Sequence, residues 1–302
     1  MGQGTEGVTG VALVEVYRSN RRADCDERAL VLAAVGVASE LVSLGDSFAL
    51  LVPEDSVTAA VTHLKDYDEE GRSRQREPGP IRAHPDAWLG SAGYAVVLVT
   101  VADCAAGGLL GFDWFSSGEL VPGLIRSGEL WRVVTALTLH VDFGHLITNL
   151  GFGMLFGYLA GQLLGPGIAW ASILAAGALG NFFDALLMPP THRAIGASTA
   201  VFATLGLLAA YSWRRRSGRS ARWPYRWAPL IAAGALLALI GAGGEHTDVL
   251  AHLTGFFAGT VFGVVYGSLA VPRYGRALAQ LLAGASTLAV IVGAWLFALI
   301  RA

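Results

Sequence analysis

The chain has few charged residues, only two cysteines and a single lysine. Charged side chains make up 15% of its 302 residues, whereas about 25% is usual in a soluble protein. Cys25 and Cys104 predict no disulfide framework and show no metal-ligand spacing. The net charge of −2 provides no strong positive field, so we expect no nucleic-acid partner. The chain is instead rich in apolar residues, with a mean hydropathy of +0.53.

The charged residues are concentrated near the N-terminus, and a series of apolar runs follows them. This division predicts a small soluble domain over residues 1–70, a polar linker over 71–87 and a multi-span membrane domain over 88–302. The first apolar run of the chain is short and contains Glu15, so we expect no signal peptide.

The soluble part has the pattern of a small α+β domain. Strand-like and helical segments alternate along it, with strands at 11–19, 39–45 and 47–53 and helices at 26–38 and 54–70. This βαββα order predicts a ferredoxin-like sandwich, and the segment also resembles a family of small domains assigned to signal transduction. Cys25 and His63 belong to no recognisable site. We expect ordinary core and surface roles here, with an unknown partner of this domain as the alternative.

Seven apolar runs follow the linker, and each is long enough to be a candidate spanning helix. They lie near residues 88–111, 144–164, 168–187, 196–213, 228–243, 249–270 and 277–300. Arginine-rich loops stay on the cytoplasmic side; six arginines lie in 214–226, two in 271–276 and four in the linker. This bias predicts a cytoplasmic N-terminus and an outer C-terminus. The Arg-, Ala- and Gly-rich composition is typical of a GC-rich bacterial genome, which indicates the inner membrane.

The same orientation brings polar residues from three distant runs to one depth. His140, His145 and Asn149 lie at the start of one run, Ser198 at the start of another and His252 at the start of a third. All three runs pass from outside to inside, so these residues form a shallow layer below the outer surface. Polar residues inside a membrane indicate a functional site by default.

These residue types suit acyl transfer by a serine. A serine hydroxyl becomes nucleophilic when a base takes its proton, and a buried neutral histidine can act as that base. His140, His145 and His252 are all candidates on depth alone. Asn149 and His145 are four residues apart on one helix face, where both can donate hydrogen bonds to an oxyanion. Taken alone, a serine such as Ser198 is more often a packing residue.

A serine and a histidine on different helices meet only if the helices pack closely. Two runs have a glycine at every fourth residue, which permits such packing in lipid: Gly153, Gly157, Gly161 and Gly165 in one, and Gly255, Gly259, Gly263 and Gly267 in the other. His252 lies three residues before Gly255 and shares its helix face. If this face packs on the run at 196–213, His252 meets Ser198.

Three segments resemble, in the same order, the motifs of the rhomboid family of intramembrane serine proteases. GELWRVVTALTLHVDFGHLITN at 128–149 resembles the Trp-Arg element followed by His-x4-His-x3-Asn. GASTAVF at 196–202 resembles the Gly-x-Ser motif, and AHLTGFFAG at 251–259 resembles the Ala-His-x2-Gly-x3-Gly element. The resemblance covers roughly residues 88–300. Each motif alone is weakly specific, and the three together are highly specific.

The resemblance implies a two-residue dyad with Ser198 as nucleophile and His252 as base. It implies supporting roles around the oxyanion and the imidazole for five further residues: Asn149, His145, His140, Gly196 and Phe202. In the family, the asparagine, the histidine and the serine backbone N–H form the oxyanion hole, and the aromatic ring packs on the catalytic histidine. The family fold implies a core of six helices, with the seventh as an extension.

Two residues near these motifs raise separate questions. The position after the serine is usually glycine in the family and is Thr199 here. A β-branched residue there either crowds the oxyanion pocket or narrows the range of accepted substrate side chains. Asp248 lies four residues before His252 and is a candidate to orient the imidazole, although the family dyad has no third acid.

The sequence therefore predicts an intramembrane serine endopeptidase that cleaves transmembrane segments of membrane proteins near the outer face of the bilayer. We expect no cofactor and no metal, because the Glu-His-x-Asp sequence at 245–248 lacks partner ligands. His192 and His246 lie in outer loops, where solvated or gating roles are expected. Two alternatives stay open: a non-catalytic relative that binds membrane helices, and a transporter, whose internal repeats the sequence does not display.

Overall fold

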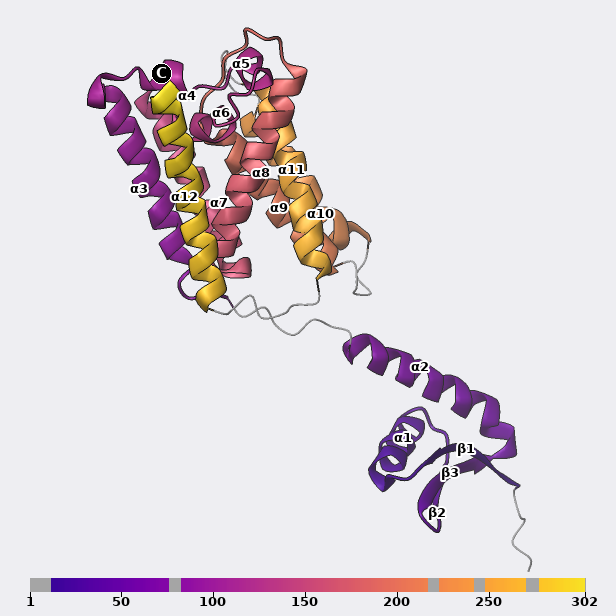
Figure 1. The fold of residues 1–302 in the computed structure, drawn as a ribbon. Helices are drawn as coiled ribbons and strands as arrows, with labels where there is room; N and C mark the ends of the chain where they lie inside the picture. The colour runs from indigo at the N-terminus through magenta and orange to yellow at the C-terminus, as the bar shows by residue number, and fades with distance from the viewer. Residues whose placement is uncertain (1–11, 76–82, 217–222, 242–247, 270–276, 302) are drawn as a thin grey trace, which may run out of the picture. The chain divides into compact units, whose positions relative to one another are not determined.

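The computed structural model describes residues 12–75, 83–216, 223–241, 248–269 and 277–301 (Figure 1). The chain divides into two compact units, Met1–Glu77 and Pro78–Ala302.

The N-terminal unit contains a three-stranded antiparallel sheet and two helices. Its elements are β1 (Leu13–Ser19), α1 (Arg22–Ala34), β2 (Glu40–Leu44), β3 (Ser47–Pro53), a 3-10 turn η1 (Glu54–Ser56) and α2 (Val57–Gln75). β3 lies between β1 and β2 and is antiparallel to both. β1 and β2 are therefore parallel to each other, as in the split βαβ arrangement of ferredoxin-like folds. The predicted βαββα order is confirmed.

The apolar sequence of β3 explains its central place in this sheet. Leu50 and Val52 of β3 are fully buried, as is Leu32 of α1. They form one core cluster with Ala60 and Leu64, which α2 contributes. Burial of these side chains holds both helices against the sheet.

α2 extends beyond the predicted end of the soluble domain. The sequence places residues 71–75 in the linker, but the helix continues through them to Gln75. Arg72, Arg74 and Gln75 are residues of high helix propensity, so a charged sequence does not by itself end a helix. Of the remaining linker residues, 76–82 lie outside the described residues and 83–86 lead into the first long helix of the second unit.

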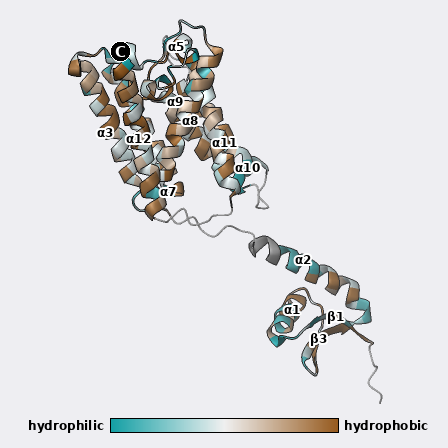
Figure 2. Ribbon diagram, viewed as in Figure 1, coloured by the Kyte–Doolittle hydropathy of each residue, from teal (hydrophilic) through white to brown (hydrophobic). Residues whose placement is uncertain are grey.

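The second unit is a helical bundle in which apolar residues run along the helices (Figure 2). Its long helices are α3 (Ala87–Ala106), α7 (Phe143–Leu164), α8 (Pro166–Leu187), α9 (Ser198–Arg216), α10 (Trp223–Gly241), α11 (Val249–Ser268) and α12 (Ala277–Arg301). In the described part of the chain, six of these are long and apolar enough to cross a membrane, and α9 is not among them. The sequence predicts seven such spans, so this prediction is confirmed for six.

α9 differs because it lies at the centre of the bundle. Arg214, Arg215 and Arg216 occupy its last turn and lower its overall hydropathy. Its apolar part packs against α7, α8, α10 and α11, and twelve of its residues are buried. The side chains of α9 are therefore covered mainly by protein. Its apolar run identifies a core helix, which periodicity alone does not distinguish from a lipid-facing one.

Short helices cover the end of the bundle where the C-terminus lies (Figure 1). They are η2 (Leu109–Gly111), α4 (Trp114–Gly118), α5 (Pro122–Arg126), α6 (Arg132–Thr135) and η3 (Ala136–Thr138). The buried Arg132 holds this connection together, because its guanidinium donates to the carbonyls of Ser116 and Glu119 and to the carboxylate of Glu129. An isolated bridge from Leu120 to Ala194 joins the connection to the segment before α9.

Candidate active site

Ser198 is the first residue of α9, and Gly196 sets the turn that precedes it. Gly196 has φ +129°, a conformation that favours glycine. A Cβ at this position would lie 2.7 Å from the His145 ring, inside van der Waals contact. The Gly196 N–H donates to the carbonyl of Ala136 at 2.9 Å. Both the backbone conformation and the nearby ring therefore require glycine two residues before the serine.

His252 lies in the first turn of α11 and forms a hydrogen bond with Ser198. Its Nε2 is 2.9 Å from Ser198 Oγ, and its Nδ1 is 2.8 Å from the carbonyl oxygen of Gly241. A carbonyl oxygen only accepts, so Nδ1 carries the proton and Nε2 accepts from the serine hydroxyl. The imidazole is buried, and the ring of Phe202 packs on it with centroids 4.5 Å apart. These contacts fix both the tautomer and the orientation of the ring.

The glycine face of α11 brings the two helices close enough for this bond. An added Cβ on Gly255 would overlap the carbonyl of Thr199, and one on Gly259 would overlap the carbonyl of Ala203. Each contact lies four residues beyond the previous one on both helices, so the two faces stay in register. The conditional expectation that this face packs on the run containing Ser198 is confirmed.

Asp142, His145 and Asn149, at the start of α7, line the same cleft as the serine–histidine pair. Asp142 caps the helix by accepting from the His145 N–H at 2.8 Å. Asn149 is buried and donates one amide hydrogen to the His145 carbonyl at 3.0 Å, so its second amide hydrogen is left to donate elsewhere. The rings of His140 and His145 meet edge to face at 5.1 Å.

His140 contacts the backbone next to the serine. The Ala197 N–H points to His140 Nε2 at 3.4 Å, a long hydrogen bond. Because Nε2 accepts from this N–H, the imidazole is neutral and its proton lies on Nδ1. This geometry suits a residue that supports the segment before Ser198.

Of the predicted site residues, all except His140 line one open cleft of about 1150 Å³. Its lining includes Ser198, His252, His145 and Asn149, together with apolar residues such as Phe152. The cleft thus combines a hydroxyl–imidazole pair, potential hydrogen-bond donors and an apolar wall. A carbonyl group entering it can meet the hydroxyl and the donors together.

The side-chain methyl group of Thr199 packs into the helix interface. It lies 2.8 Å from the position of an added Cβ on Gly180 and 2.9 Å from that on Gly255. Thr199 is buried, and its methyl group fills the space that these two glycines leave between α8, α9 and α11. The branched side chain is thus accommodated by two glycines on neighbouring helices.

Asp248, a candidate to orient the imidazole, is not bonded to it, and His192, expected to be solvated or gating, has a hydrogen-bond partner. Asp248 does not hydrogen-bond the His252 ring, because Nδ1 is bonded to the Gly241 carbonyl oxygen and Nε2 to Ser198 Oγ. Asp248 instead caps α11 through the Ala251 N–H and pairs with His192 Nε2 at 2.6 Å. His192 is therefore a partly buried, paired residue and not a freely solvated one. His246 lies outside the described residues.

Sequence reasoning missed two groups near the site. The Gly241 carbonyl that fixes the imidazole is a backbone atom, so no side-chain pattern identifies it. Asp184, at the end of α8, lies close to His192 and Asp248. A single acid within a long apolar run was the available signal, because such residues are rare in spanning helices.

The fold and the cleft define a polytopic membrane protein with a hydrogen-bonded serine–histidine pair. Residues 127–269 match the family model described as the rhomboid domain. Rhomboid-like protease 2 of Toxoplasma gondii is 28% identical over 49% of this chain and 51% of its own length. Rhomboid-like protease 3 of the same organism is 31% identical over 46% of this chain and 52% of its own length. Rhomboid protease GluP of Bacillus subtilis is 34% identical over 28% of this chain and 16% of its own length.

The match of residues 127–269 to the rhomboid domain and the relatives named rhomboid proteases together support a rhomboid family protein. The chain spans about half the length of the Toxoplasma relatives that it matches. Five of the long helices that the structure describes lie in the matched segment, namely α7, α8, α9, α10 and α11, whereas α3, α12 and the N-terminal unit lie outside it.

Proposed function

We propose that this chain is an intramembrane serine endopeptidase with Ser198 as nucleophile and His252 as general base. The observation that carries the proposal is the 2.9 Å hydrogen bond between Ser198 Oγ and His252 Nε2. This distance is within the range for a nucleophile and its base. The Gly241 carbonyl orients the imidazole in the place that an acid takes in a catalytic triad.

The reaction follows from this pair. Ser198 Oγ attacks the peptide carbonyl while its proton passes to His252 Nε2. The imidazolium then gives that proton to the leaving amine, and an acyl-enzyme remains. Water attacks the ester with His252 again as base, which releases the new carboxylate and restores the serine.

The oxyanion of the tetrahedral intermediate needs hydrogen-bond donors. We assign this role to His145, Asn149 and the Ser198 backbone N–H. Ser198 opens α9, and N–H groups in the first turn of a helix have no partner within the helix. His140 and Gly196 act as supports, because one contacts the Ala197 N–H and the other leaves room for the His145 ring.

The substrates we propose are transmembrane segments of membrane proteins, cleaved near the outer face of an inner bacterial membrane. The arginines at the end of α9 favour the cytoplasm for that end, and Ser198 lies at the other end of the same helix. By this orientation the N-terminus is cytoplasmic and the C-terminus lies outside. The resemblance implies that substrate entry is controlled by α10 and by residues 242–248. Most of the segment 242–248 lies outside the described residues.

A reconstituted cleavage assay tests the proposal. The full chain is incubated in liposomes with a single-span substrate, and the products are identified by mass spectrometry. We expect cleavage by the wild type and loss to background for Ser198→Ala and His252→Ala, since the same changes cost on the order of 10⁶-fold in a soluble serine protease. Ser286→Ala, at an exposed serine of α12, is the matched control. Cleavage that persists in both dyad variants would exclude the proposed dyad.

A further inference from the structure

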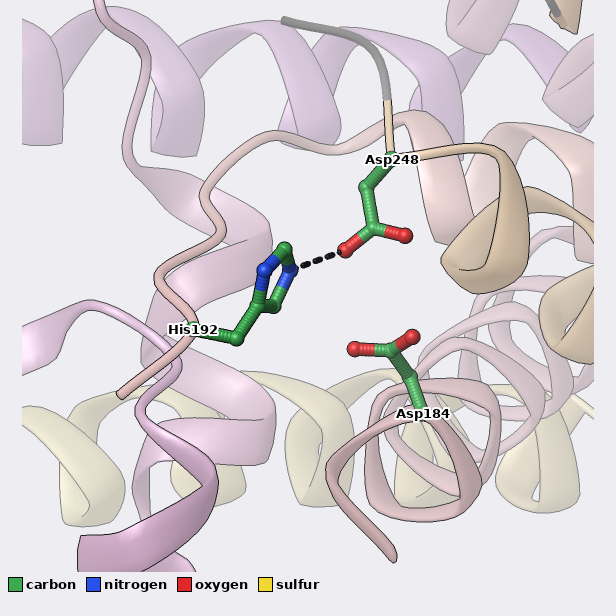
Figure 3. A group of neighbouring side chains, drawn as sticks. All are labelled: Asp184, His192 and Asp248. Atoms are coloured by element: carbon green, nitrogen blue, oxygen red, sulfur yellow. Dashed lines mark hydrogen bonds and ion pairs between the residues drawn. The ribbon is translucent and has the colours of Figure 1, made fainter. Parts of the chain in front are cut away.

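Three metal-ligating side chains from separate elements meet beside the cleft. Asp184 comes from the last turn of α8, His192 from the connection between α8 and α9, and Asp248 from the N-cap of α11. Figure 3 shows the two carboxylates and the imidazole turned toward a common space. One potential ligand atom from each residue lies within 4.8 Å of the other two.

Asp184 is the unusual member of this group. Its side chain is fully buried, and neither carboxylate oxygen has a hydrogen-bond partner among the residues that the structure describes. A buried carboxylate without partners is costly, so either a proton or a cation must compensate it. His192 already pairs with Asp248 at 2.6 Å. The hydrogen bond within the group therefore provides a partner for the Asp248 carboxylate and leaves the Asp184 carboxylate without one.

We propose that Asp184, His192 and Asp248 bind a divalent transition-metal ion, and that Zn²⁺ is the ion best suited to them. Zn²⁺ accepts imidazole nitrogen and carboxylate oxygen together, and three protein ligands with one open position are a common set. The hard cations Ca²⁺ and Mg²⁺ prefer all-oxygen sites, so the imidazole disfavours them. The sequence predicts no metal because the segment 245–248 lacks partner ligands. In the proposed site, Asp248 obtains its partner ligands, Asp184 and His192, from distant segments.

Ion binding requires only a small rearrangement. Metal–ligand distances of about 2.0–2.2 Å place neighbouring tetrahedral ligand atoms about 3.4 Å apart. His192 Nε2 and Asp248 Oδ2 are 2.6 Å apart, so they must separate as the ion replaces the proton between them. Both residues line the cleft, which gives an ion a route to the site from solvent.

A bound ion would join the elements that carry the proposed dyad without touching it. His252 lies one helical turn after Asp248, and Ser198 follows the connection that contains His192. The proposed role of the ion is to hold these elements together, so its binding is measurable without any proteolysis. Ligand binding to the folded state raises the unfolding temperature in proportion to the logarithm of free ligand above its dissociation constant.

The test uses the full chain without an affinity tag, in a Ser198→Ala background and treated with a chelator that is then removed. Zinc chloride is titrated, bound zinc per chain is measured by elemental mass spectrometry, and thermal unfolding is recorded. We expect one zinc per chain and an unfolding midpoint that rises with zinc. Asp184→Asn should weaken binding by at least the ~10–100-fold that loss of an outer-shell partner costs.

Asp113→Asn is the matched control, because Asp113 is also an N-cap aspartate but is exposed and lies outside the group. It should bind zinc as the background does. Asp184→Asn removes an uncompensated buried charge and should fold; if it does not, His192→Gln should show the same loss of zinc. The proposal is overturned if the Ser198→Ala protein binds no zinc. It is also overturned if a folded Asp184→Asn or His192→Gln variant binds zinc as tightly as the Ser198→Ala protein does.

Discussion

Two glycine series look alike in the sequence but perform different packing roles in the structure. On α11, Gly255, Gly259 and Gly263 lie against backbone carbonyls of α9. On α7, Gly153 lies against the Tyr94 ring and Gly157 against the Trp170 ring. The first series brings two backbones together, whereas the second makes room for two aromatic side chains, which stack on each other with centroids 4.8 Å apart.

This difference indicates which helix–helix distance is held rigidly and which can change. A backbone carbonyl inside a helix cannot move without breaking the helix hydrogen bonds, but a side chain can change its rotamer. The α9–α11 contact therefore fixes the distance between Ser198 and His252. The α7 contact with α3 and α8 should tolerate more change.

Gly259→Ala should have the largest effect on stability. Its Cβ would overlap the Ala203 carbonyl, so α9 and α11 must separate. Overpacking typically costs about 1–3 kcal/mol and occasionally more, and here it also pulls the two proposed catalytic residues apart. We expect a lower unfolding temperature together with loss of substrate cleavage. Wild-type stability and activity in this variant would contradict the backbone-contact account.

Gly157→Ala should have a smaller effect that a second substitution relieves. The added methyl would meet the Trp170 indole, and a smaller ring at 170 leaves space for it. We expect Gly157→Ala to be destabilising alone and less so combined with Trp170→Phe. The four proteins of this double-mutant cycle are compared by thermal unfolding, with an expected coupling of about 0.5–3 kcal/mol. If the stability effects of the two substitutions simply add, contact with the Trp170 indole is not the cause of the Gly157→Ala destabilisation.

Thr199→Ser should reduce stability modestly and leave the cleavage-site preference unchanged. It removes the methyl group that packs between Gly180 and Gly255 and keeps the hydroxyl. Loss of one buried methyl group costs about 1 kcal/mol. Product mapping with a library of substrate sequences checks the preference. A changed preference would mean that the methyl group acts on the cleft and not on the helix interface.

Gly293→Ala on α12 should have the smallest effect and serves as the matched control for both series. A Cβ there meets no atom of the described part of the chain within 4 Å. Substitutions away from packed contacts usually change stability by about 0.5 kcal/mol or less. Unfolding temperature and cleavage should both match the wild type. A loss as large as that of Gly259→Ala would remove the distinction between packed and open glycines.

Much of the fold could be predicted because apolar runs and arginine-rich loops depend on local sequence. The seven runs locate the seven long helices that the structure describes in the second unit, but the central place of α9 depends on packing against its neighbours. The proximity of Ser198 and His252 could be inferred from depth and from the glycine face of α11. The Asp184–His192–Asp248 group could not, because its members come from separate elements and no single motif joins them. The Gly241 carbonyl carries no side-chain signal at all.

The most direct test of the proposed dyad is covalent labelling of the folded protein with a fluorophosphonate, which phosphonylates an activated serine with loss of fluoride. Peptide mapping by mass spectrometry locates the adduct. We predict an adduct on Ser198 in the wild type, slower labelling in Gly259→Ala and none in His252→Ala. An unlabelled Ser198 in folded protein, or labelling that does not depend on His252, would contradict the dyad.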